Sequence, residues 1–139
     1  MKLLTLGAVL SFAAAASHAG IAVTGAPAYR YFRAPEAYAA AADAGSWNPA
    51  VITMMLAALF AVWGLYALAA SGMTRPLPLM EPAIHGITAI YLVRGMFLFP
   101  QLLGHNLFTA SYIVAPRDLV FSTIVLAIGH VHLADVSAR

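Results

Sequence analysis

Four long apolar stretches, separated by polar and proline-containing segments, set the pattern of this chain. Each stretch is about twenty residues long, the length that a helix needs to cross the hydrocarbon core of a bilayer. Their approximate bounds are 3–23, 50–70, 82–101 and 119–136. We therefore predict a single transmembrane domain over residues 1–139, an all-α, integral membrane four-helix bundle.

The first stretch permits two interpretations. A lysine at position 2, an apolar run and small residues before Gly20 are typical of a cleavable signal peptide. The apolar character nevertheless resumes after Gly20 and extends to a spanning length. We adopt the uncleaved helix, which keeps His18 in the protein. Small residues also recur on one face of this helix, which favours close packing in lipid: Gly7, Ser11 and Ala14.

The segment that follows, residues 24–48, is polar enough to lie outside the membrane. Pro35 and Glu36 precede a run of alanines, which predicts a short interfacial helix with the proline at its first position. We expect Arg30 and Arg33 to lie in the membrane interface. Specific binding of an anionic headgroup by these two arginines is the alternative.

Helix-start signals precede the second and fourth stretches. Asn48 followed by Pro49 is typical of an N-cap and a first helical residue, and Asp118 is a second candidate N-cap. The second stretch carries no charge. It presents another stripe of small residues for helix packing: Ala57, Ala61, Gly64 and Ala67.

One arginine lies well inside the third stretch. An ionised arginine in hydrocarbon costs several kcal/mol unless it has a partner, so Arg94 requires an explanation. Each helical residue rises about 1.5 Å, and sequence position therefore converts to depth. By this count Arg94, His18, Thr53 and Ser122 share a layer roughly 5 to 10 Å below the surface next to the first loop.

This layer is the predicted ligand site. Arg94 is the candidate anion contact, His18 a hydrogen-bond donor or proton-exchanging group, and Ser122 a hydrogen-bond partner. Asp118, or else Glu36 in the first loop, is the candidate counter-ion. The alternative is that Arg94 has a purely structural partner or extends to the interface along apolar surface.

Histidines mark the opposite side of the membrane. His85 in the third stretch and His130 in the fourth lie at comparable depth and could ligate a haem between the two helices. Ordinary contacts between helices are the simpler interpretation, and we assign no cofactor and no metal. His132 is two residues from His130, about 200° around a helix, so these two rings cannot face one ligand.

Composition excludes several classes of protein. The chain is 63% hydrophobic and 9% charged, whereas a soluble domain has about 25% charged residues. Its seven basic residues are scattered and cannot form a nucleic-acid-binding face. No cysteine is present, which removes thiol catalysis and thiolate metal sites. Phosphate-binding loops and hydrolase motifs are also absent from the sequence, so we do not expect an enzyme.

Several short runs, taken in order, carry a resemblance. They are Gly25-Ala26-Pro27-Ala28-Tyr29-Arg30-Tyr31-Phe32, Trp63-Gly64-Leu65-Tyr66-Ala67-Leu68, Arg75-Pro76-Leu77-Pro78-Leu79, Tyr91-Leu92-Val93-Arg94-Gly95 and Gly129-His130. Together they resemble an uncharacterised family of small four-helix bacterial inner-membrane proteins, and the layout is similar to DoxX-like proteins in architecture only. The resemblance implies an uncleaved first helix and supplies neither a reaction nor a ligand.

The expected function is that of a non-enzymatic, multi-pass protein of the bacterial inner membrane. It would be an accessory subunit or a binder of lipid or a small anion. The alternative is a redox-associated membrane protein that binds quinone or haem through His85 and His130. The expected partners are the lipid bilayer and, through helix faces, a second copy or another membrane protein.

Overall fold

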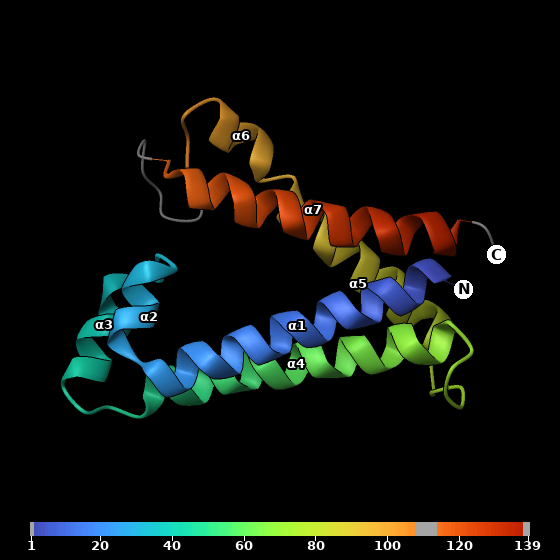
Figure 1. The fold of residues 1–139 in the computed structure, drawn as a ribbon, viewed down its shortest axis with the longest axis horizontal. Coiled ribbons are helices and arrows are strands. Elements are labelled where there is room, and N and C mark those ends of the chain that lie inside the picture. The colour runs from blue at the N-terminus through green and yellow to red at the C-terminus, as the bar shows by residue number, and fades with distance from the viewer. Residues whose placement is uncertain (1, 108–113, 138–139) are drawn as a thin grey trace. The chain divides into compact units, whose positions relative to one another are not determined.

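Helices account for 78% of the computed structural model, which describes residues 2–107 and 114–137 (Figure 1). No β-strand occurs in this described part, and the predicted all-α class is confirmed. The helices in order are α1 (Lys2–Thr24), α2 (Ala26–Tyr31), α3 (Glu36–Asp43), α4 (Asn48–Ala70), α5 (Met80–Gly95), α6 (Leu98–Leu102) and α7 (Pro116–Val136).

Within the residues that the structure describes, four segments are long and apolar enough to cross a membrane, as the hydrophobic pattern predicts. They are Leu3–Thr24, Asn48–Ala70, Met80–Leu102 and Pro116–Val136, and together they indicate a multi-pass membrane protein. Within a bilayer a helix satisfies its own backbone hydrogen bonds, which is why such apolar segments are helical.

The third segment differs from the single helix that we predicted. It consists of α5 and α6, with a break at Met96 and Phe97. Pro100 explains the break, because it has no N–H to donate to the carbonyl of Met96 and its ring would clash with that carbonyl. In the first turn of α6 the same proline is tolerated, since those N–H groups lack helical partners in any case.

Contacts within the chain define two compact units. Unit 1 comprises Met1–Leu10 and Trp63–Arg139, and unit 2 comprises Ser11–Val62. Helices α1 and α4 each run through both units. The assignment of the whole chain to one domain stays a prediction.

Glycines bring α5 and α7 of unit 1 into close contact. A Cβ at Gly95 would lie 2.5 Å from the Cα of Leu126, and one at Gly129 would lie 3.0 Å from the amide nitrogen of Leu92. Small residues allow such an approach of two backbones in lipid, where dispersion contacts drive helix packing. These two contacts also fix an antiparallel register, with Gly95 beside Leu126 and Leu92 beside Gly129.

The amino-terminal part of α1 packs within the same unit. Gly7 lies directly against the ring of His132, and Leu4 and Ala8 are fully buried. Most of the small residues that were predicted to form packing faces on α1 and α4 are buried, which confirms that these faces pack against other parts of the chain. Their buried members are Gly7, Ser11, Ala57, Gly64 and Ala67.

The first loop of unit 2 contains two short helices where one was predicted. Helix α2 was not predicted, and its Tyr29 packs with Ala26 and Ala39 in a small core. Helix α3 is the predicted interfacial helix, but it begins at Glu36, with Pro35 as its N-cap rather than its first residue. Its position relative to a bilayer interface stays a prediction.

Both predicted capping positions shift by a few residues. Asn48 is already helical, and its amide donates to the Ser46 hydroxyl over 3.3 Å. Asp118 is the third residue of α7 rather than its N-cap. Its carboxylate accepts a hydrogen bond from the amide of Ala115, the actual N-cap, over 2.8 Å. This is the acidic half of a capping box, which lacks its other half because alanine has no side-chain oxygen.

Candidate functional site

The α5–α7 crossing brings together two of the predicted ligand-binding residues. Nη1 of Arg94, on the last turn of α5, donates to the Ser122 hydroxyl on α7 over 3.3 Å. Ser122 is fully buried and Arg94 is half-buried. The guanidinium carbon also lies 5.4 Å from the centre of the Phe97 ring, within range of a cation–π contact.

The Arg94 side chain does not stay at the depth of its own Cα. Because Gly95 lies beside Leu126, the Cα of Arg94 is level with that of Ala127. The guanidinium of Arg94 nevertheless bonds to Ser122, which is five residues nearer the start of α7. At about 1.5 Å per residue the guanidinium is displaced by roughly 7 Å toward that end of the helix pair. This is the direction expected of an arginine that extends toward the nearer membrane surface.

Asp118 lies one helical turn before Ser122 on the same buried face of α7. Its Oδ2 accepts hydrogen bonds from the Ala115 amide and from Nδ2 of Asn106, the latter over 3.0 Å. A buried carboxylate needs such donors, because without them its desolvation would cost several kcal/mol. Asp118 thus brings negative charge to the same end of α7 toward which Arg94 extends.

Gln101 on α6 is a further buried polar residue, which the hydrophobic pattern marked only as the end of a predicted span. Its side chain is 4% exposed, and its Oε1 makes no hydrogen bond within residues 2–107 and 114–137. Helix α6 packs against α7. The residue is the only glutamine of the chain and stands in an apolar run, a signal that could have identified it from sequence.

The remaining predicted ligand residue, His18, belongs to unit 2. Its Nδ1 lies 2.8 Å from the carbonyl oxygen of Ala14, one turn earlier, and its ring packs 4.8 Å from the ring of Phe60. Thr53, also assigned to the polar layer, bonds to the Tyr29 hydroxyl within the same unit. The roles of His18 at a ligand site and of Asp118 as a counter-ion of Arg94 stay predictions.

Glu36, the other candidate counter-ion, has a partner in the first loop. Its Oε1 accepts from Nη2 of Arg30 over 2.9 Å, and Asp43 accepts from the same nitrogen over 2.8 Å. The hydrogen bonds with Glu36 and then Asp43 raise the pKa of Arg30 above its ordinary value. This exposed charge network links α2 to α3.

The two histidines proposed as haem ligands lie at different levels of unit 1. Because Leu92 lies beside Gly129, His130 of α7 is level with Tyr91 of α5. Tyr91 is six residues after His85, so the levels of His85 and His130 differ by about 9 Å along the helix axis. Both rings are exposed, and each Nδ1 lies within hydrogen-bonding distance of the carbonyl four residues earlier on its own helix. Nothing in this arrangement favours a shared cofactor, and the ligand role stays a prediction.

His132 and His130 face different surroundings, as their spacing requires. His132 is fully buried, and its ring contacts that of Tyr91 at 5.4 Å, which in turn contacts Trp63 at 5.1 Å. Neither imidazole nitrogen of His132 makes a hydrogen bond in the described part of the chain. Within the same part, no three acidic or histidine side chains are close enough to hold a metal ion.

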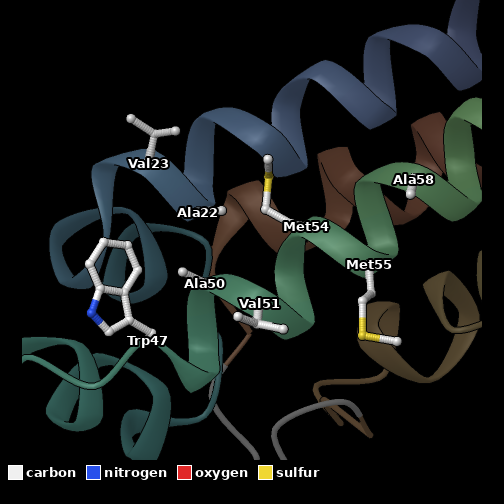
Figure 2. A pocket seen from close by; sticks show the side chains of 8 residues that line it. All are labelled: Ala22, Val23, Trp47, Ala50, Val51, Met54, Met55 and Ala58. Carbon is white, nitrogen blue, oxygen red and sulfur yellow. The ribbon is translucent and has the colours of Figure 1, made fainter.

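Unit 2 carries an open apolar groove of about 630 Å³ (Figure 2). Figure 2 shows Met54 and Met55 projecting from α4 and Val23 from the end of α1. No charged side chain lines this groove, so its chemistry suits hydrocarbon rather than a polar substrate. The full lining is Ala22, Val23, Trp47, Ala50, Val51, Met54, Met55 and Ala58.

No family model, no curated protein and no solved structure matches the chain. The resemblance to small four-helix membrane proteins therefore stays an expectation. Printed hydrogen bonds and the buried face of α7 define a polar cluster in unit 1, which we call the Arg94 cluster. Its members are Arg94, Asn106, Asp118 and Ser122.

Proposed function

We propose that this chain is a non-enzymatic, multi-pass protein of the bacterial inner membrane that binds an oxyanion at Arg94. The ligand would be the phosphate of a lipid headgroup or a small free anion. The observation that supports the proposal most directly is the hydrogen bond from Arg94 to the buried Ser122 hydroxyl between two apolar helices.

The chemistry of the guanidinium favours this ligand class. It carries five N–H donors in a planar arrangement that matches the oxygens of phosphate and carboxylate groups. Ser122 and the Phe97 ring hold the group in place from two sides. A positive charge in so apolar a segment attracts negative charge more strongly than it would in water, because the surroundings screen it poorly.

The displacement of the side chain suits a lipid headgroup in particular. With Arg94 counted at roughly 5 to 10 Å below the surface, a displacement of roughly 7 Å would bring its guanidinium to the depth at which lipid phosphates begin and leave its aliphatic stem in hydrocarbon. A free anion would need to reach the same position from the water phase.

The test compares lipid retention by Arg94→Leu, Arg94→Lys and the unchanged protein in nanodiscs. Native mass spectrometry would count retained phosphatidylglycerol against diacylglycerol, and calorimetry would measure binding of inorganic phosphate. We expect Arg94→Leu to weaken phosphatidylglycerol retention at least tenfold, since hydrogen bonds to charged groups contribute about 1.5–3 kcal/mol. Arg94→Lys should lie in between, because lysine keeps the charge and loses the planar arrangement.

Arg75→Leu is the matched control. Arg75 is exposed, lies in the connection between α4 and α5, and carries the same charge. Equal losses in the two leucine variants would show that overall charge decides retention, and unchanged retention in Arg94→Leu would overturn the proposal. Phosphate binding without lipid selectivity would identify a free anion as the ligand.

A further inference from the structure

His132 is a titratable residue outside the Arg94 cluster, and it lies where three helices of unit 1 meet. Its ring is fully buried on α7 and contacts the ring of Tyr91 on α5, with the two centres 5.4 Å apart. The backbone of Gly7 on α1 also lies against this ring, so close that a Cβ at Gly7 would overlap Nε2 of His132. The imidazole thus joins the amino-terminal turns of α1 to both α5 and α7, all within one unit.

The surroundings of the His132 ring suit a neutral imidazole. Neither ring nitrogen makes a hydrogen bond in the described part of the chain. Protonation gives the ring a full charge and makes both nitrogens N–H donors, which need acceptors or water. A buried charge that lacks them costs far more free energy than the same charge in water. Because the ring is fully buried, water reaches it only when a neighbouring helix moves away.

Two titratable side chains lie near the His132 ring. Asp135, three residues further along α7 and also buried, attracts a protonated imidazole through its negative charge. It provides neither ring nitrogen with a hydrogen-bond acceptor, so it reduces the cost of the proton without removing it. The phenol of Tyr91 on α5 carries no charge at neutral or acidic pH. The buried residues that α1 contributes to unit 1 are uncharged: Leu4, Gly7 and Ala8.

We infer that His132 is a pH-sensitive latch, which holds the amino-terminal part of α1 against α5 and α7 at neutral pH and releases it when the ring takes up a proton. A water-exposed histidine is protonated below about pH 6.5, so acid favours the arrangement in which water reaches the ring. The contact is therefore fully stable above about pH 6.5 and weakens below it. For one proton, the equilibrium constant for release rises by at most about tenfold per pH unit. This latch is independent of anion binding at Arg94.

The experiment measures the separation of α1 and α7 at two pH values. Val9 on α1 and Leu133 on α7 are exposed and lie in the same unit, and the chain has no cysteine of its own. The double variant Val9→Cys, Leu133→Cys therefore accepts two spin labels outside the core. Pulsed electron paramagnetic resonance of the full chain in nanodiscs would record the distance distribution at pH 7.5 and at pH 5.

We expect one distance at pH 7.5 and a second, longer distance at pH 5. The ratio of the longer to the shorter population should rise about tenfold between the two pH values. One proton taken up over the 1.5 units below pH 6.5 sets an upper limit of about thirtyfold, and the attraction by Asp135 reduces it.

Substitutions at His132 connect the response to this ring. His132→Phe keeps an aromatic ring that cannot take up a proton, so the pH response should disappear while the distance at pH 7.5 is retained. His132→Gln is also uncharged and provides the same test if the larger phenylalanine ring overlaps Gly7 and prevents folding. His130→Phe is the matched control, because His130 lies two residues away on the same helix with its ring exposed. This control should keep the full response.

Asp135→Asn tests the sign of the effect. Without the attraction of the carboxylate, the closed contact tolerates the proton less well, so release should occur at a higher pH than in the unchanged chain. A release that does not move to higher pH in this variant would contradict the inference. Identical distance distributions at pH 7.5 and pH 5 in the unchanged chain would overturn it. So would a response that persists in a folded His132→Phe or His132→Gln variant, or one that disappears in His130→Phe.

Discussion

Replacing Gly95 by alanine tests the helix crossing on which the Arg94 cluster depends. The new Cβ would lie 2.5 Å from the Cα of Leu126 and 2.7 Å from both its Cβ and its amide nitrogen. Ordinary carbon contacts lie at about 3.5–4.0 Å. Because two of the three atoms belong to the backbone, no side-chain rotation relieves the overlap, and α5 must move away from α7 by about 1 Å.

The energetic cost follows from two opposing effects. Overpacking of a close contact typically costs about 1–3 kcal/mol, and a backbone neighbour places Gly95→Ala at the upper end of that range. Alanine is the better helix former by about 1 kcal/mol, which offsets part of this cost. We expect a net destabilisation of about 2 kcal/mol, together with loss of the 3.3 Å hydrogen bond between Arg94 and Ser122.

Gly86→Ala on the same helix is the matched control. Apart from the neighbouring backbone of its own helix, no atom lies within 4 Å of a Cβ built at Gly86, so only helix propensity acts there, and the variant should gain up to about 1 kcal/mol. Equilibrium unfolding in mixed micelles, followed by circular dichroism, measures both variants. Equal stability of Gly95→Ala and Gly86→Ala would refute the close packing of α5 on α7.

Two further substitutions test local hydrogen bonds by the same unfolding assay. Tyr29→Phe removes a buried 3.1 Å hydrogen bond to the Thr53 hydroxyl and should lower the free energy of unfolding by about 1 kcal/mol. The reasoning fails if Tyr29→Phe lowers stability by the same amount in a Thr53→Val background, where that bond no longer exists. Asp118→Ala removes the acceptor of the Ala115 amide and of Asn106 and should cost about 1–2 kcal/mol, whereas Asp118→Asn, which keeps one acceptor oxygen, should cost less. Comparable losses in the alanine and asparagine variants would contradict the capping role.

Local signals in the sequence were sufficient for several structural features. Length and predominantly apolar character predicted the four long helical segments, because a bilayer admits only segments that satisfy their own backbone. Counting residues along predicted spans also put Arg94 and Ser122 at similar depth, and the structure joins them. A long arginine side chain tolerates an error of several residues in such a count.

The same count was too coarse for the histidines. His85 and His130 were assigned a common depth, and the register separates them by about 9 Å. Spacing alone required His130 and His132 to face different directions, but it did not indicate which one would be buried. Contacts with Gly7 and Tyr91 decided that His132 lies inside.

The sequence by itself determined how many segments are long and apolar enough to span a membrane and where prolines and polar residues separate them. Only the tertiary structure decided which face of each helix meets a neighbour. The reason is that a membrane helix is apolar on every side, so hydrophobic periodicity does not mark a core face. Close contacts at Gly7, Gly95 and Gly129 make that choice, and with it they assemble the Arg94 cluster from residues on α5, on α7 and in the loop after α6.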